Sequence, residues 1–260
     1  MEKRSVDDFL VIDNIQLNTN SFLIRMSGPK PLPEIKPGQF VNAEIKDCSE
    51  IFLRRPFSVF DVDYKYNYLS IIVKILGKGS GKLAEVSKNA VISLVYPLGK
   101  SFTYPSDSDR ILFIGGGSGV APMLFLAKEC GLPADKVDMI FGARSLEDHI
   151  KIDGYRSYGK FHFTTDDGTY GFKGMVTEHP IVKGNLTEYD KIYACGPLSM
   201  MKAVAAEAGK RDIFCEVSLE NSMACGFGVC LCCIEPTRRG NLCICTEGPV
   251  FNIKELKWEI

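Results

Sequence analysis

The sequence predicts a β-barrel, then an α/β domain with a parallel sheet, and then a small cysteine-rich module. Three observations lead to this fold class: short apolar segments fill the first hundred positions, strands alternate with helices from Arg110 onward, and six of the ten cysteines lie between Cys225 and Cys245. We place the three parts at residues 1–103, 104–213 and 214–260. With 260 residues, the chain is long enough for two domains and a small appendage.

Composition argues against several classes of protein. Hydrophobic residues make up 45% and charged residues 24%, as in an ordinary globular protein, and the net charge of -1 gives no sign of a nucleic-acid or acidic-membrane partner. The first residues contain no long apolar run, so we do not expect a secretory signal. The longest apolar runs, such as 121–127, are too short to cross a bilayer. We therefore expect a cytoplasmic protein with no nucleic acid and no membrane partner.

The first part has the pattern of a barrel. Its apolar segments are short, rich in β-branched and aromatic residues, and bounded by turn residues; they are 9–17, 21–26, 39–45, 56–62 and 68–76. Only residues 79–86 have the pattern of a short helix. Many short strands with a single helix are typical of a small closed barrel.

The second part alternates between the two element types. We expect strands at 110–114, 137–143, 160–165 and 191–196, and helices at 120–130 and 197–210. Such alternation predicts a parallel sheet with right-handed crossovers.

The cysteine-rich segment has the spacing of an iron–sulfur site. Cys225, Cys230 and Cys233 form C-x4-C-x2-C, which is the plant-type spacing for a 2Fe–2S cluster. Gly226 and Gly228 lie inside the first loop, where they allow the backbone to approach the sulfur atoms and to direct N–H groups at them. The pattern therefore predicts a cluster held by four thiolates.

Six cysteines for four positions leave the ligand set open. The fourth ligand is Cys243 or Cys245, and spacing alone does not decide between them. Cys232 lies inside the C-x2-C step and is expected to point away. Zinc is the main alternative because C-x2-C pairs also bind it, although zinc sites typically pair two such steps and here the second half is C-x-C. Free thiols are the remaining alternative, since a disulfide framework is not expected in a cytosolic chain.

A glycine-rich loop lies directly between a predicted strand and a predicted helix. Its glycines are Gly115, Gly116, Gly117 and Gly119. Backbone N–H groups in such a loop favour phosphate, and glycines allow close approach. The loop does not fit G-x-G-x-x-G, because Pro122 stands three positions after Gly119, and alone it is also explained as a purely structural turn.

Two later strand ends support dinucleotide binding. Asp166 and Asp167 follow the strand that ends at Thr165, and a carboxylate there accepts from a ribose 2′-OH and repels a 2′-phosphate, which favours NAD over NADP. A solvated acidic turn explains this pair equally well. Another strand ends at Cys195, Gly196 and Pro197. Because ligands bind at the carboxyl ends of parallel strands, these residues and the glycine loop together predict an NAD site.

The barrel carries its own candidate phosphate site. The run Leu53–Ser58 contains two arginines, an aromatic ring and a hydroxyl; an Arg can bind a pyrophosphate and a ring can pack on another ring. A second basic, glycine-rich stretch covers 72–74 and 77–81. Each stretch alone is also explained as a charged surface loop. The three histidines, at 149, 162 and 179, are separated along the chain, and we expect structural or solvated roles for them.

Taken together, these motifs resemble the ferredoxin–NADP reductase superfamily, and more closely its electron-transfer subunits of type B dihydroorotate dehydrogenase. The marks of the resemblance are RRPFS, GKGSGKL, PLG, GGGSGVAP, CGP followed by SMM, and SLENSMACGFGVC with CTEGPVF. The match covers essentially the whole chain. It implies an FAD-binding barrel, an NAD-binding α/β domain and a C-terminal 2Fe–2S module.

The resemblance also implies which residues bind each cofactor. The FAD contacts would be Arg55, Pro56, Phe57, Ser58, Ile72, Val73, Lys74, Gly79 and Ser80. Phe57 stands where many of these reductases have Tyr, so only packing is expected there. The cluster ligands would be Cys225, Cys230, Cys233 and Cys245, because Cys245 precedes E-G-P-V-F as the family's fourth ligand does. Cys232 and Cys243 would then be bystanders.

The resemblance implies an NAD-linked oxidoreductase subunit without an orotate site of its own. Electrons would pass between NAD+ and an FMN-containing dihydroorotate dehydrogenase catalytic subunit through FAD and the cluster, in a heterotetramer of two plus two subunits that serves UMP biosynthesis. Hydride transfer needs ring stacking more than acid–base residues. The alternatives are an NADH:ferredoxin-type reductase subunit, a hydrogenase diaphorase subunit, and a zinc-stabilised nucleotide-binding regulator without enzymatic activity.

Overall fold

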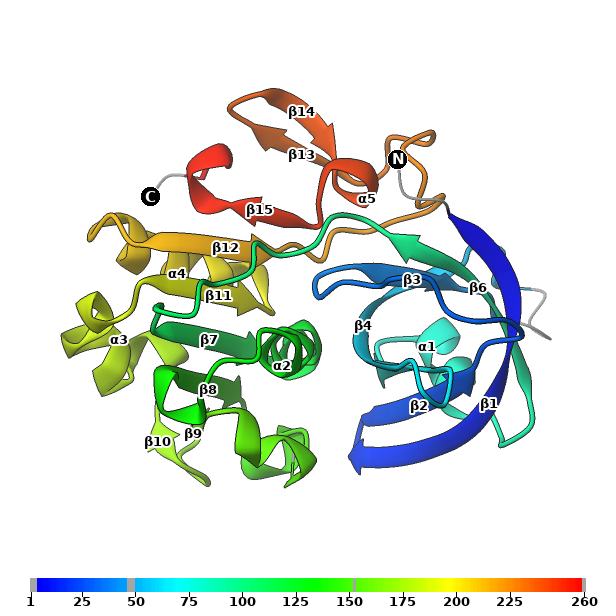
Figure 1. Cartoon of the computed structure of the whole chain (residues 1–260), viewed down its shortest axis with the longest axis horizontal. Helices are drawn as coiled ribbons and strands as arrows, with labels where there is room; N and C mark the ends of the chain where they lie inside the picture. The colour runs from blue at the N-terminus through cyan, green and yellow to red at the C-terminus, as the bar shows by residue number, and fades with distance from the viewer. Residues whose placement is uncertain (1–3, 46–49, 152, 259–260) are drawn as a thin grey trace.

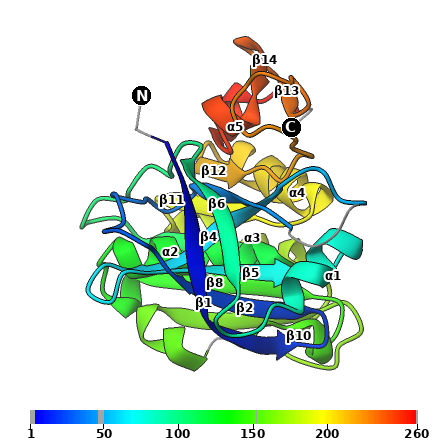
Figure 2. The same cartoon turned by 90° about the vertical axis from the view of Figure 1, so that its right-hand side faces the viewer.

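The computed structural model describes residues 4–45, 50–151 and 153–258, which form a barrel, an open sheet with helices, and a small hairpin module (Figure 1). The barrel and the sheet lie side by side, and the hairpin module lies along one edge of both (Figures 1 and 2). No helix among the described residues is long and apolar enough to cross a membrane.

The barrel is closed in the order β1-β2-β5-β4-β3-β6. Its strands are β1 (Ser5–Asn18), β2 (Ser21–Ser27), β3 (Phe40–Ala43), β4 (Arg55–Asp63), β5 (Tyr68–Lys74) and β6 (Val91–Leu98), and helix α1 covers Lys78–Ala84. The predicted barrel is confirmed. The sequence reading did not include β6, which closes the barrel by pairing with both β1 and β3.

The open sheet has the order β10-β9-β8-β7-β11-β12-β15. Its strands are β7 (Ile111–Gly116), β8 (Val137–Ala143), β9 (Lys160–Thr165), β10 (Phe172–Lys173), β11 (Lys191–Cys195), β12 (Phe214–Ser218) and β15 (Val250–Asn252). All neighbours are parallel except β12 and β15, which pair antiparallel. The predicted parallel sheet is therefore confirmed.

Helices cover both faces of this sheet. They are α2 (Val120–Glu129), α3 (Pro180–Gly184) and α4 (Leu198–Gly209). Alternate residues of β7 point to opposite faces: Phe113 packs in the core that contains α2, and Ile114 packs in the core that contains α4. This packing places the end of β7, where the glycine loop begins, between two helices.

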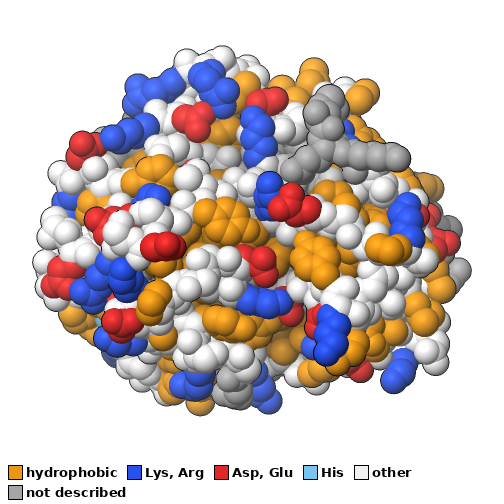
Figure 3. Space-filling view, in the orientation of Figure 1, with side chains coloured by type: hydrophobic (Ala, Val, Ile, Leu, Met, Phe, Trp, Pro, Cys, Tyr) orange, Lys and Arg blue, Asp and Glu red, His pale blue; other side chains and the backbone are white. Residues whose placement is uncertain are grey.

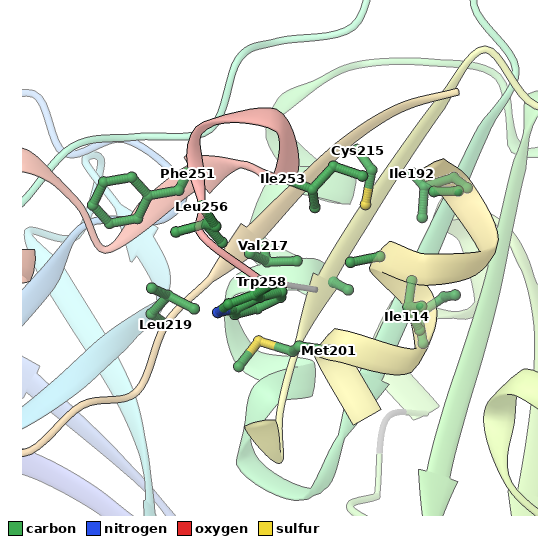
Figure 4. Close-up of a cluster of buried hydrophobic side chains, with 14 of the residues drawn as sticks. Ile114, Ile192, Met201, Cys215, Val217, Leu219, Phe251, Ile253, Leu256 and Trp258 are labelled. Carbon is green, nitrogen blue, oxygen red and sulfur yellow. The ribbon is translucent and has the colours of Figure 1, made fainter. Parts of the chain in front are cut away.

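The C-terminal segment packs on the α4 face of the sheet. Figure 4 shows Trp258 lying against Met201 of α4 and close to Val217 of β12. The indole Nε1 of Trp258 donates to Glu235 Oε1 at 3.3 Å, which joins this segment to the hairpin of β13 (Ile234–Thr237) and β14 (Gly240–Cys243). A short helix, α5 (Ile244–Glu247), follows the hairpin. Strands β12 and β15 lie after residue 213 but belong to the sheet of the second part, so this boundary does not coincide with a boundary between packed units. The three domain ranges stay a prediction.

Candidate functional site

A cavity of about 620 Å³ lies where the three parts of the chain meet. Eight of the nine residues predicted to contact FAD line it; they are Arg55, Pro56, Phe57, Ser58, Ile72, Lys74, Gly79 and Ser80. Val73 is the exception, because side chains alternate along β5 and Val73 is fully buried in the barrel core. The two predicted segments, which lie far apart in the sequence, therefore face the same cavity.

Basic side chains and bare backbone line one part of the cavity. The guanidinium of Arg55 donates to the carbonyl oxygens of Leu53 (2.8 Å) and Arg54 (3.3 Å), which holds its head near Gly79. A Cβ added at Gly77 would meet no protein atom within 4 Å, so this backbone borders open space. A cation beside an open glycine backbone fits the pyrophosphate of a dinucleotide such as FAD.

The neighbouring cation has a different role. Arg54 donates to Ser93 O at 2.7 Å and to Ser93 Oγ at 3.0 Å, and it does not line the cavity. It therefore ties the start of β4 to β6. Only Arg55 of the arginine pair is placed to bind a ligand.

The predicted NAD residues meet at the carboxyl edge of the sheet. Cys195 pairs with Gly115 in register, and a Cβ added at Gly119 would overlap the carbonyl group of Cys195. A Cβ at Gly116 would lie 2.8 Å from Pro197 Cδ. The two loops are therefore in backbone contact, which only glycine allows. From the glycine loop, Ser118 reaches the cavity, as does Ala121 of α2.

Asp166 and Asp167 have different surroundings. Asp166 is exposed at the end of β9, two strands from β7 and thus about 10 Å along the sheet edge. Asp167 Oδ1 accepts from Thr169 N at 2.9 Å and from Thr169 Oγ1 at 2.7 Å, and these bonds lower the pKa of the Asp167 carboxyl. Asp167 thus closes its own turn, and the assignment of Asp166 to a ribose stays a prediction.

Several cavity residues were missed by the sequence reading. They are Phe40, Glu50, Ile51, Leu76, Leu219, Glu220, Asn221, Met223 and Pro249. Glu220 lies inside the SLENSM motif, yet nothing in the sequence places it beside the barrel. Its side chain is open to the cavity but enclosed by protein elsewhere, and this desolvation raises the pKa of the Glu220 carboxyl, although Cys195 and Lys74 act to lower it.

The predicted cluster ligands form two pairs. Cys225 and Cys230 lie close enough to affect each other's ionisation, as do Cys233 and Cys245, and Cys245 N donates to Cys233 Sγ at 3.4 Å. Each iron of a 2Fe–2S cluster takes two thiolates, so two such pairs are compatible with this kind of cluster.

Backbone N–H groups point at these sulfur atoms. Phe227 N donates to Cys225 Sγ at 3.3 Å, and Gly228 N donates to Cys245 Sγ at 3.1 Å. Burial raises the pKa of the Cys225 thiol, but such backbone bonds outweigh it and lower that pKa to about 6. Amide donors aimed at sulfur stabilise the negative charge of a thiolate-bound cluster.

The two remaining cysteines of the segment differ from each other. Cys232 is exposed, and its thiol donates to Ser222 O at 3.6 Å; that it points away from the cluster stays a prediction. Cys243 is half-buried at the end of β14, where Cys233, Cys225 and Cys230 add to the burial that raises the pKa of its thiol. The pairing favours Cys245 as the fourth ligand, and the ligand set stays a proposal.

The cluster loop reaches the molecular surface. Cys230 is exposed, and the apolar side chains around it are 40% (Phe227), 81% (Val229) and 59% (Leu231) exposed. Figure 3 shows hydrophobic side chains at the surface in the upper right of the view, the region in which Figure 1 draws the segment between β12 and β13. An apolar rim around a redox centre is the kind of surface that a protein partner covers.

Two family models match parts of this chain. Residues 220–257 match the iron-sulfur cluster binding domain of dihydroorotate dehydrogenase B, and residues 113–206 match the oxidoreductase NAD-binding domain. The chain resembles the structure of an NADH-dependent reduced ferredoxin-NADP oxidoreductase studied for electron bifurcation, with a TM-score of 0.84 and 26% identity over 100% of this chain and 92% of that one. A ferredoxin reductase of carbazole 1,9a-dioxygenase shares the fold, at 21% identity and a TM-score of 0.69 over 81% of this chain and 67% of that one.

Two relatives cover nearly the whole chain. The dihydroorotate dehydrogenase B (NAD(+)) electron transfer subunit of Fusobacterium nucleatum is 32% identical over 98% of this chain and 99% of its own length. The subunit of the same name from Geobacillus kaustophilus is 34% identical over 85% of this chain and 86% of its own length. At this identity and coverage, the chain belongs to the family of dihydroorotate dehydrogenase B (NAD(+)) electron transfer subunits.

Proposed function

We propose that this chain passes electrons between NAD(H) and a dihydroorotate dehydrogenase catalytic subunit. It is an NAD-linked oxidoreductase subunit whose cofactors are FAD, a 2Fe–2S cluster and NAD(H). One observation carries the proposal: the wall of the barrel cavity includes Ser118 from the glycine loop and Met223 from the segment that leads to Cys225. A flavin in this cavity therefore borders both the NAD loop and the cluster module.

FAD supplies the chemistry that links the two ends, since it exchanges two electrons together with NAD(H) and one at a time with a 2Fe–2S cluster. The protein residues bind and orient. Arg55 and the backbone at Gly77 and Gly79 would hold the phosphates, and Phe57 and Ser58 would contact the flavin ring. Ser118 and Ala121 would form the floor on the nicotinamide side. Cys225, Cys230, Cys233 and Cys245 would hold the cluster.

The partner is an FMN-containing catalytic subunit in an assembly of two plus two subunits. The exposed rim of Phe227, Val229 and Leu231 is the surface that we assign to it, because electrons leave or enter through the adjacent cluster. In this assembly the chain serves UMP biosynthesis in the cytoplasm.

The first experiment is an anaerobic titration of the purified protein with NADH. We expect flavin bleaching at the visible band together with a rhombic EPR signal from a reduced 2Fe–2S centre. A colourless protein that contains zinc and does not respond to NADH contradicts the proposal. Pull-down from the native cell followed by mass identification tests the partner: recovery of a hydrogenase or glutamate-synthase-like subunit contradicts the dihydroorotate assignment.

A second candidate function has a specific observation in its favour. The chain matches the NADH-dependent reduced ferredoxin-NADP oxidoreductase structure over its full length. A role as an NADH:ferredoxin-type reductase subunit would use the same three cofactor sites with another partner. Reduction of ferredoxin by NADH without dihydroorotate dehydrogenase would favour this role, and a stable complex with that catalytic subunit would exclude it.

A further inference from the structure

The cavity of about 620 Å³ described above, here called the flavin cavity, has one wall formed by the segment between β12 and the first predicted cluster ligand. Leu219, Glu220, Asn221 and Met223 all line the cavity. Two residues after Met223 comes Cys225, so their Cα atoms are at most about 7 Å apart. Met223 therefore touches the cavity and lies beside the cluster loop at the same time.

Met223 also packs against the core that contains two cluster ligands. This core includes Cys233, Cys245 and, from the barrel, Phe40. Met223 is half-buried, and Phe40 lines the cavity as Met223 does. Phe40 and Met223 therefore belong both to the cavity wall and to the packing of the core that contains Cys233 and Cys245.

Strand β3 reaches both the cavity and the cluster loop. Phe40 and Asn42 lie on the same face of the strand because they are two residues apart. Asn42 Nδ2 lies 3.5 Å from the carbonyl oxygens of both Ala224 and Cys225, on the cluster loop. One end of β3 thus borders the flavin cavity, and the other end borders the cluster loop. Met223 directly precedes the two residues that Asn42 approaches, Ala224 and Cys225.

We propose that Met223 is a positioning residue that fills the space between the flavin cavity and the cluster ligands and keeps water out of it. A thioether side chain is flexible and polarizable, so it fills an irregular gap. The inference rests on the proposed function. It predicts that loss of the Met223 side chain slows electron transfer between the two centres more than it slows the reaction with NADH.

The test compares Met223→Ala, Met223→Leu and a matched control, Met175→Ala, in the holoprotein. Met175 is 65% exposed and lies outside the cavity wall. Stopped-flow spectra follow flavin bleaching by NADH, freeze-quench EPR follows cluster reduction, and a redox titration gives the cluster midpoint potential. The titration reports on the cluster surroundings independently of turnover.

For Met223→Ala we expect the rate of cluster reduction to fall about tenfold or more relative to the rate of flavin bleaching, which is a barrier increase of about 1.4 kcal/mol. The cluster potential should shift in the positive direction, because water that enters the gap stabilises the more negatively charged reduced cluster. Met223→Leu and Met175→Ala should behave as wild type. If Met223→Ala loses the cluster, Met223→Gln, which keeps the length but adds a polar group, takes its place with the same expected changes.

Two outcomes overturn the assignment. The first is that the Ala and Gln variants reduce the cluster at the wild-type rate and keep the wild-type cluster potential. The second is that flavin bleaching and cluster reduction slow by the same factor, which indicates a general structural role. Failure of NADH to reduce the cluster in the wild-type protein is a separate result, because it removes the proposed function itself.

Discussion

The thiol of Cys195 donates a hydrogen bond to Glu220 Oε1 at 3.8 Å. Cys195 ends β11 and is fully buried between the glycine loop and the sheet, while Glu220 follows β12 and lines the flavin cavity. The bond therefore joins the predicted NAD edge to the wall of the cavity. It places a carboxyl group of raised pKa at the point where the proposed FAD and NAD sites meet.

Replacing this carboxyl group changes the charge that the flavin experiences. An ionised Glu220 opposes the negative charge that reduction adds, so Glu220→Gln should raise the flavin midpoint potential at pH 8 by on the order of 30 mV, which is 1.4 kcal/mol for a two-electron couple. As the pH is lowered, the wild-type carboxyl takes up a proton, and the midpoint potentials of the two proteins should converge. Because desolvation raises the Glu220 pKa, this convergence should begin at a pH above 4.5, the ordinary pKa of the group. Spectroelectrochemistry at several pH values measures this. Glu188→Gln, on the far side of the sheet and paired with Arg110, is the control; a pH-independent difference would contradict the electrostatic role.

Asp166 should set the preference between the two dinucleotides. Asp166→Ser removes the carboxylate that repels a 2′-phosphate, and we expect the ratio of kcat/KM for NADPH to that for NADH to rise about tenfold, a change of about 1.4 kcal/mol. Diaphorase assays with an artificial acceptor give both constants. Asp167→Ser is the matched control, because Asp167 is bonded to Thr169 within its own turn. An equal change in both variants would assign the preference to the turn as a whole.

The cysteine substitutions separate ligands from bystanders. Serine at 225, 230, 233 or 245 should remove the visible cluster absorption and the bound iron and sulfide, since each pair loses a thiolate. Cys232→Ser should retain the full cluster because its thiol bonds to Ser222 O. Cys243→Ser should retain it as well. A cluster lost from the Cys243 variant and kept in the Cys245 variant would reverse the choice of the fourth ligand.

A buried carboxylate at the other edge of the sheet should govern acid stability. Burial raises the pKa of Asp138, but hydrogen bonds from His162, Tyr189 and Arg110 outweigh it and lower that pKa from 3.8 to about 2. The folded state therefore favours the ionised form, and its contribution of about 2 kcal/mol is present above pH 4 and is lost as the pH falls toward 2. Denaturant titration of Asp138→Asn should show the loss at pH 6 and a smaller difference at pH 3. Equal destabilisation at both values would point to lost packing instead of charge.

The sequence alone determined the chemistry of this protein. Cysteine spacing, the glycine loop and the arginine motif are local patterns, because a ligand imposes its requirements on a few consecutive residues. The same locality explains why strand and helix periodicity was enough for the fold class. Cys195 shows what such local patterns do not predict. The sequence marks this residue as the end of a strand, but its contacts with Gly119 and Glu220 are made with two other segments of the chain.

Only the tertiary structure decided which of these residues share a site. Register on β5 turned Lys74 toward the cavity and Val73 into the barrel core, and packing brought Asn42 to Cys225 across 183 positions of sequence. It also placed Met223 between the cavity and the cluster loop. Such contacts depend on how whole segments pack against one another, and burial of apolar surface, which drives that packing, is not directional and leaves no short pattern in the sequence.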